Sequence, residues 1–145
     1  MIAPALGNSV LLTHADQALL GVRSARVAAY AGRAHVFGGV LDYLKPGART
    51  MGGVLEHLRR ELEEELGLGA ADLPGEPRAL ALVRDMRIAQ PELIWHWEVP
   101  GELAGLAARL ERAEHDSHVL FRRGGGDMEM LTPVARAAVG LWADG

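Results

Sequence analysis

The chain has 145 residues, a formal net charge of −4 and no cysteine, with 49% hydrophobic and 23% charged residues. This length and balance are typical of one globular domain, predicted here over residues 1–145, that buries a core of its own. The lack of cysteine excludes disulfides, thiolate catalysis and cysteine-based zinc sites. The acidic balance argues against a nucleic-acid or membrane-surface partner. Without a signal-peptide pattern or a membrane-spanning run, we expect a cytoplasmic protein with no membrane partner.

Apolar runs separated by turn residues alternate with helical patterns along the chain. In chain order, the predicted elements are strands at Val10–Leu12, Ala18–Leu20 and His35–Val40, a helix at Thr50–Leu66, strands at Ala79–Ile88 and Leu93–Val99, a helix at Glu102–Ala113, a strand at Val119–Phe121 and a helix at Thr132–Trp142. This order predicts an α/β or α+β sandwich, in which helices pack on a mixed sheet.

The central helix ends in an acidic stretch, and residues 60–68 read RELEEELGL. Glu61, Glu64 and Glu65 stand at positions i, i+3 and i+4, so they are neighbours on one side of the helix. Like charges at this spacing destabilise a helix by about 0.2–0.5 kcal/mol per pair, and the helix C-terminus also disfavours anions. The simplest relief is a hard divalent cation, Mg²⁺ or Mn²⁺, which prefers oxygen ligands. From spacing alone, an acidic surface at the helix end is an equally good interpretation.

The other sides of this helix support a defined orientation for the carboxylates. An apolar stripe must face a core, and it consists of Leu55, Leu58, Leu62 and Leu66. Gly67 can adopt the left-handed conformation that ends a helix, and Leu68 can fold back onto the last turn. The three carboxylates should therefore lie along the boundary between the core stripe and the solvent side.

This stretch resembles the second half of the Nudix box, the signature of hydrolases that act on nucleoside diphosphates linked to another group. Every specified position of Arg-Glu-Leu-x-Glu-Glu-x-Gly-Leu is matched from Arg60 to Leu68. The first half of the box departs, because its glycine and glutamate positions hold Pro46 and Gly52. The simplest alignment takes Gly39 as the box glycine and lengthens the loop around Tyr43–Met51, so the first glutamate of the box is missing.

The resemblance implies a Nudix-like sandwich that cleaves the diphosphate linkage of a nucleoside diphosphate derivative with Mg²⁺ or Mn²⁺. The implied metal ligands are Glu61, Glu64, Glu65 and the carbonyl group of Gly39. Glu64 also belongs to the implied catalytic set, Arg60 orients the carboxylates, and the pair Gly38-Gly39 lies beside the substrate. The implied partner is a small nucleotide-type substrate, with no stable nucleic-acid complex, and a homodimer is one possible assembly because family members often form one.

Two further residues stand where family members often carry functional side chains. Glu114 follows a predicted helix, and the resemblance implies an extra metal ligand or the general base there, a role that His115 or Asp116 could take instead. A solvated helix end is the plain alternative. Arg23 closes the second strand, and its guanidinium suits bidentate contact with a substrate phosphate. A surface arginine is the simpler interpretation of this residue.

Three residues with aromatic rings are further site candidates. His57 lies one turn before Glu61 on the same side of the helix, where family members usually have a small residue. It could hydrogen-bond a carboxylate or narrow the pocket, but a satisfied, partly buried histidine is the favoured interpretation. Trp95 and Trp97 alternate along one strand and share a face. They could stack a base, but a core or interface position is favoured.

Two other functions stay open at this point. A Nudix-fold module that senses a nucleotide without cleaving it would explain the missing box glutamate and the lengthened loop. A structural or interaction domain would explain the acidic helix as surface. The complete set of three carboxylates favours the hydrolase over both. The loop Tyr43–Met51 is predicted to border the substrate cleft, because long loops in compact domains are often functional.

Overall fold

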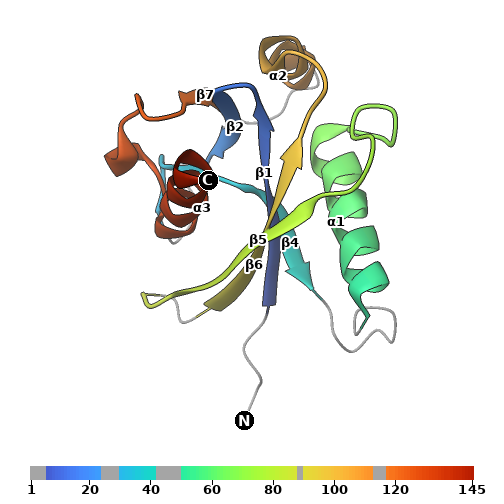
Figure 1. Ribbon diagram of the computed structural model, residues 1–145, viewed down its shortest axis with the longest axis horizontal. Coiled ribbons are helices and arrows are strands. Elements are labelled where there is room, and N and C mark those ends of the chain that lie inside the picture. The colour runs from blue at the N-terminus through green and yellow to red at the C-terminus, as the bar shows by residue number, and fades with distance from the viewer. Residues whose placement is uncertain (1–5, 24–29, 42–49, 88–89, 113–116) are drawn as a thin grey trace.

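The computed structural model describes residues 6–23, 30–41, 50–87, 90–112 (backbone only from 109 to 112) and 117–145. They form one mixed sheet with helices on both faces (Figure 1). The strands are β1 (Leu6–His14), β2 (Gln17–Val22), β3 (Ala34–His35), β4 (Phe37–Leu41), β5 (Arg78–Asp85), β6 (Gln90–Glu98) and β7 (His118–Arg122). The helices are α1 (Met51–Leu66), α2 (Leu103–Arg112) and α3 (Pro133–Asp144), with a short 3₁₀ helix, η2, at Met128–Met130. The predicted sandwich is confirmed.

β1 is the central strand of the sheet. It pairs in parallel with β6 along one side, and in antiparallel fashion with β4 and β2 along the other. β5 extends the sheet beyond β6, and both β3 and β7 pair with β2. Every residue of β1 from Gly7 to Thr13 is buried, because helices cover both faces of the sheet at this strand.

Separate cores lie on the two faces of the sheet. Successive side chains of a strand point to opposite faces, so Val10 and Leu12 join the core under α1 while Leu11 joins the core under α3. The core under α1 also takes Leu103 and Leu106 from α2. Figure 1 shows α1 and α3 on opposite sides of the sheet, with α2 near one end.

Local signals set both ends of α1 where they were predicted. The side chain of Thr50 accepts a hydrogen bond from the N–H of Gly53 at 3.0 Å, which caps the first turn. Gly67 has a φ of +65°, and its N–H donates to the carbonyl of Glu63 at 2.9 Å. Leu68 is 1% exposed, so the expected apolar contact after the helix is present.

Several element boundaries differ from the predictions. β5 ends at Asp85, three residues before Ile88, and the Asp85 carboxylate accepts the N–H of Arg87 at 2.9 Å in a turn. β6 begins at Gln90, so Glu92 lies inside a strand and not in a linker. The η2 helix was not predicted, and its N-cap is the side chain of Asp127. In the described part of the chain, no helix is long and apolar enough to cross a membrane.

Candidate active site

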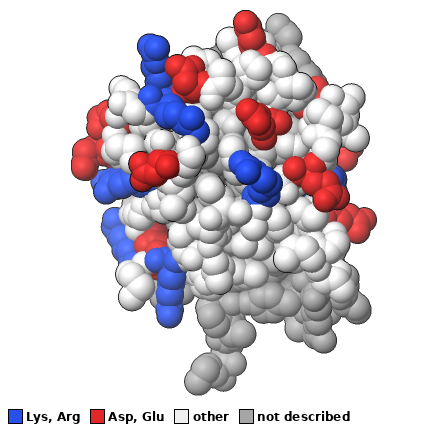
Figure 2. Space-filling view, viewed as in Figure 1, with Lys and Arg blue, Asp and Glu red and all other residues white. Residues whose placement is uncertain are grey.

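The orientation of α1 on the sheet, set by its buried side, determines where the carboxylates of Glu61, Glu64 and Glu65 lie. Leu58, Leu62 and Leu66 are buried in the core under α1, as the predicted stripe requires. Glu61 flanks this stripe, and its side chain keeps 24% of its surface exposed, whereas Glu64 and Glu65 are exposed residues. Figure 2 shows acidic side chains on both sides of the view, including the side that holds α1, whereas most of the basic ones in this view lie nearer α3.

The glycine pair of β4 lies directly against these carboxylates. Gly39 is paired with Asn8 of β1, and a Cβ atom added to Gly39 would lie 2.6 Å from the Cδ atom of Glu61. Gly38 has a φ of +154°, and an added Cβ would collide with the carbonyl oxygen of Asn8, so the position requires glycine. The N–H of Gly38 donates a hydrogen bond to the carboxylate of Glu65. The fold thus joins the two parts of the predicted site across the loop that separates them.

Burial, together with repulsion within this acidic cluster, raises the pKa of Glu65. Partial burial raises the pKa of the Glu65 carboxyl to about 7, and the charges of Glu61 and Glu64 add to the rise, although the side chain keeps an exposed side. The hydrogen bond from Gly38 acts in the opposite direction. Among the described residues, no lysine or arginine forms an ion pair with the three carboxylates, and His57 is the only basic side chain in contact with one of them. The cluster therefore lacks a counter-charge within the described structure.

The donor set fits a hard divalent cation in type and in position. Carboxylate and carbonyl oxygens are the ligands that Mg²⁺ and Mn²⁺ prefer, and the missing side chain of Gly39 leaves room beside Glu61. Within the described residues, no three acidic or histidine side chains are gathered closely enough to hold an ion as they stand. Rotation of the Glu64 and Glu65 side chains is sufficient to bring helical neighbours at this spacing together.

Solved bacterial structures share this architecture. A mutT/nudix family protein from Listeria innocua matches with a TM-score of 0.68 at 21% sequence identity, over 99% of this chain and 96% of that one. A MutT NUDIX hydrolase from Burkholderia pseudomallei matches with a TM-score of 0.64 at 23% identity, over 97% and 98% of the two chains. The chain has the Nudix fold.

A third neighbour is an ADP-ribose pyrophosphatase from Streptococcus suis, with a TM-score of 0.56 at 14% identity over 98% of this chain and 91% of that one. No family model and no curated protein matches the sequence. The likeness therefore concerns the fold, and it agrees with the architecture that the second half of the Nudix box implied.

Of the two arginines that precede Glu61, Arg59 has the defined contacts. Its guanidinium donates to the carbonyl of Gly75 at 3.3 Å and lies 5.4 Å from the ring centroid of Trp97. Arg60 is exposed and forms no ion pair within the described part of the chain. The orienting role of Arg60 stays a prediction.

Arg23 directly follows β2, within electrostatic reach of Glu92 and His35. Burial raises the pKa of Glu92, and the positive charge of Arg23 opposes that rise, whereas burial lowers the pKa of His35 and Arg23 adds to that fall. Glu92 shares a strand face with Ile94, which belongs to the core under α3, so this group lies on the face of the sheet opposite α1. The electrostatic neighbours of Glu65 are Glu61 and Glu64, and its pKa carries no contribution from Arg23. Contact between Arg23 and a substrate phosphate stays a prediction.

Glu92 is a buried carboxyl group that the sequence pattern does not predict. It is 9% exposed and accepts a hydrogen bond from the hydroxyl of Ser9. Its neighbour in the β1–β6 pairing is Gly7, where an added Cβ would lie 2.9 Å from three side-chain atoms of Glu92. Burial raises the pKa of Glu92, and the hydrogen bond from Ser9 opposes that rise. The signal that could have revealed Glu92 is its two-residue spacing from Ile94.

The remaining predicted residues divide into two groups. Glu114 with its neighbours His115 and Asp116, and residues 42–49 of the long loop, lie outside the described residues, so their roles stay predictions. Trp95 and Trp97 are 4% and 2% exposed within the core under α1, which confirms the core interpretation.

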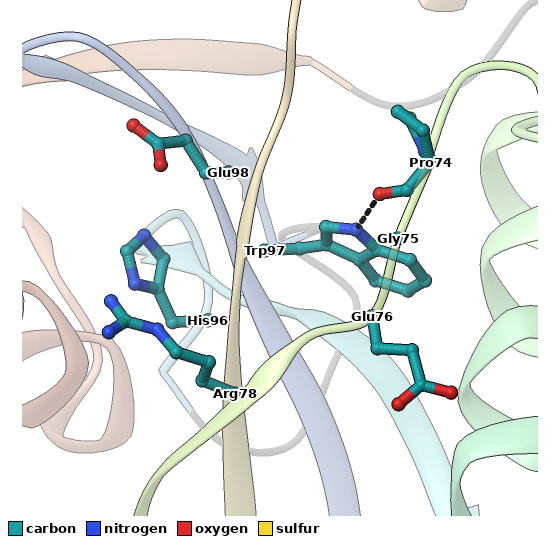
Figure 3. A pocket seen from close by; sticks show the side chains of 7 residues that line it. All are labelled: Pro74, Gly75, Glu76, Arg78, His96, Trp97 and Glu98. Carbon is teal, nitrogen blue, oxygen red and sulfur yellow. Dashed lines mark hydrogen bonds between the residues drawn. The ribbon is translucent and has the colours of Figure 1, made fainter.

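The hollow drawn in Figure 3 lies at an edge of the sheet and has a volume of about 310 Å³. It is lined by Pro74, Gly75, Glu76, Arg78, His96, Trp97 and Glu98. The indole N–H of Trp97 donates to the carbonyl of Pro74 at 3.1 Å and closes one wall. None of the lining residues belongs to α1 or β4, so this hollow is separate from the carboxylate cluster.

Proposed function

We propose that the chain is a hydrolase that cleaves the diphosphate linkage of a nucleoside diphosphate derivative and that depends on Mg²⁺ or Mn²⁺. One observation carries the proposal: the carboxylates of α1 lie against the glycine pair of β4, although the loop between them departs from the Nudix spacing. In this arrangement Glu61, Glu64, Glu65 and the carbonyl of Gly39 would hold the cation.

When bound, such a cation neutralises diphosphate charge and lowers the pKa of a coordinated water. The residues of the chain supply the positioning. The absence of a side chain at Gly39 leaves room for the Glu61 carboxylate, and the N–H of Gly38 donates to the Glu65 carboxylate. Groups held in place around a bound cation would lower a barrier through positioning and charge stabilisation.

Three further roles belong to the proposal. Arg23 would bind a substrate phosphate through its guanidinium, because planar guanidinium groups suit bidentate contact with phosphate oxygens. Glu114 would act as general base or extra ligand, and Arg60 would orient the carboxylates. A small nucleotide-type substrate, a cytoplasmic location, a single domain and a possible homodimer are parts of the same prediction.

The half-motif and the fold support the proposed substrate class. One neighbour with the Nudix fold is an ADP-ribose pyrophosphatase, which makes ADP-ribose the first compound to test. Nucleoside diphosphate derivatives carry two linked phosphates, and a divalent cation binds such a pair well because it bridges their oxygens.

A nucleotide sensor that does not hydrolyse its ligand is the second candidate. Two observations favour it: Gly52 stands in the position of the first glutamate of the box, and the described acidic side chains are not gathered into a ready metal site. The sensor and the hydrolase make different predictions for the same assay.

The test is a screen of nucleoside diphosphate derivatives, ADP-ribose among them, with Mg²⁺ or Mn²⁺ and a coupled phosphatase that releases inorganic phosphate from the products. Thermal unfolding is measured in parallel, because an ion that binds only the native state raises the melting temperature. A hydrolase gives metal-dependent phosphate release and a metal-dependent rise in melting temperature. Ligand-dependent stabilisation without phosphate release would favour the sensor, and no response to either ion at millimolar concentration would refute the metal site.

A further inference from the structure

A buried amide on β1 is held in one orientation by a tryptophan. Asn8 is fully buried and faces α1, and the indole N–H of Trp95 donates to its Oδ1 atom at 2.8 Å. An indole nitrogen can only donate a hydrogen bond, so the oxygen of the Asn8 amide must face Trp95 and the NH₂ group must face α1. The usual ambiguity between amide oxygen and nitrogen is thereby removed.

The NH₂ group of Asn8 then decides which nitrogen of His57 carries the proton. One N–H donates to the carbonyl of Val54 at 2.9 Å, and the other points to Nδ1 of His57 at 3.1 Å. Because Nδ1 faces a donor, it must be the acceptor nitrogen, and the ring proton lies on Nε2. Nε2 faces Oε1 of Glu61 at 3.5 Å, slightly longer than an ordinary N–H···O hydrogen bond of about 2.7–3.2 Å.

The Glu61 carboxylate therefore has two defined neighbours. The space left open at Gly39 adjoins both of its oxygens, and Nε2 of His57 lies 3.5 Å from its Oε1 atom. The side chain of His57 is 14% exposed, so this contact is largely shielded from water. A neutral ring that donates one N–H orients a carboxylate without supplying the full positive charge that a lysine or arginine would bring.

We propose that His57 is a positioning residue for Glu61, and that the hydrogen-bond chain Trp95–Asn8–His57 keeps an N–H donor directed at that carboxylate. The proposal rests on the proposed function, in which Glu61 binds the divalent cation. Hydrogen bonds to ligating side chains fix their orientation, and their loss typically weakens metal binding by about 10- to 100-fold. His57 acts through Glu61 and has no direct role toward the substrate.

Two substitutions at the same position separate positioning from a structural role. His57→Asn retains an acceptor for Asn8 near the place of Nδ1 but is too short to reach Glu61. His57→Gln retains an N–H donor near the place of Nε2 and so still reaches Glu61. If His57 only accepts the hydrogen bond of Asn8 in the core, His57→Asn should lower Mn²⁺ affinity and stability less than His57→Gln. If His57 positions Glu61, His57→Gln should lower Mn²⁺ affinity less than His57→Asn.

The experiment measures Mn²⁺ affinity by electron paramagnetic resonance for the wild type and both variants, with urea unfolding of each and ¹⁵N NMR of the imidazole of the wild type. We expect NMR to show Nε2 protonated and Nδ1 unprotonated. We also expect His57→Asn to bind Mn²⁺ about 10-fold more weakly or worse, while His57→Gln retains most of the affinity. Because the defect lies in metal binding, raising the Mn²⁺ concentration should restore the hydrolysis rate of His57→Asn toward that of the wild type.

Several results would overturn the proposal. One is a proton on Nδ1 in the NMR spectrum. Another is wild-type Mn²⁺ affinity in His57→Asn, which would leave the proposed hydrolase intact and remove only the positioning role. A third is a loss of Mn²⁺ affinity in both variants that is proportional to their loss of stability in urea. A wild type that binds no Mn²⁺ would refute both the proposed function and the positioning role, and this result is distinct from the others.

Discussion

Replacing Gly39 with alanine tests the junction between β4 and α1 most directly. The new Cβ would lie 2.6 Å from Cδ and 2.7 Å from Oε2 of Glu61, whereas carbon atoms in contact are normally about 3.5–4.0 Å apart. The Glu61 carboxylate must therefore move by about 1 Å. Since this group is the tip of a flexible side chain, the backbone can stay in place. The free energy of unfolding should then change by no more than about 1 kcal/mol.

The functional effect of Gly39→Ala should be much larger than its effect on stability. Misplacing a catalytic group by about 1 Å can lower a rate by about 100-fold. We therefore expect kcat/KM to fall by about 100-fold on the best substrate of the screen, and Mn²⁺ affinity to fall as well. The measurements are steady-state kinetics at saturating Mg²⁺, a Mn²⁺ titration, and urea unfolding of the same samples.

Gly52→Ala is the matched control for this substitution. A Cβ at Gly52 meets nothing within 4 Å, and the residue lies in the first turn of α1. Alanine there should stabilise the protein by about 0.5–1 kcal/mol and leave the rate unchanged. Wild-type kcat/KM and Mn²⁺ affinity in Gly39→Ala would refute the conclusion that Glu61 depends on the space at Gly39. An equal loss of rate in both variants would trace the effect to α1 and not to the junction.

The remaining predictions concern single side chains. Glu64→Gln should lower the hydrolysis rate by about 100-fold, because a loss of about 3 kcal/mol in charge stabilisation corresponds to that factor. Glu63→Gln should match the wild type in the same kinetic assay, because Glu63 points away from Glu61 around the helix, at about 100° per residue. Gly52→Glu restores the first glutamate of the box, and it should raise the free energy of unfolding by about 1 kcal/mol because glutamate favours a helix more than glycine does. The hydrolysis rate should not rise, because residue 52 lies on the side of α1 away from Glu61. A rise in rate would show that the missing glutamate limits activity. Burial and the charge of Arg23 lower the pKa of His35 from 6.5 to about 4. The contribution of the neutral His35 ring to stability is therefore fully present above pH 6.5 and is lost as the pH falls toward 4. The His35→Gln variant should show a weaker decline of urea stability in that range, and an unchanged decline would contradict the assignment.

The parts of the fold that could be predicted are those set by local interactions. The N-cap at Thr50, the leucine stripe and the left-handed Gly67 are all encoded within α1 and its ends, and the structure confirms each of them. The spacing of Glu61, Glu64 and Glu65 likewise follows from helix geometry alone. Such features need no knowledge of what the helix packs against.

The contacts that complete the candidate site could not be predicted, because they join segments far apart in the chain. Asn8 and His57 are 49 residues apart, and only the packing of α1 on β1 brings them together. For this reason a partly buried histidine was the most that helix periodicity could indicate at His57. The sequence around Glu92 predicts a linker. A buried carboxyl group in a strand there depends on Ser9 and Gly7 in a neighbouring strand, which the local sequence does not show.

The first half of β1 holds polar side chains beside the candidate site, whereas the middle of the strand belongs to the two apolar cores. From Val10 to Leu12 the strand is apolar on both faces, and these residues hold α1 and α3 against the sheet. Just before them, strand alternation sends Asn8 toward α1 and its neighbour Ser9 toward the opposite face. Asn8 donates to His57, which in turn contacts the candidate metal ligand Glu61. Ser9 donates to Glu92, whose pKa is influenced by the charge of Arg23. Two adjacent residues therefore connect polar groups on both faces of one strand. Because both are buried, each must be hydrogen-bonded, and that requirement restricts the side chains that these two positions can hold.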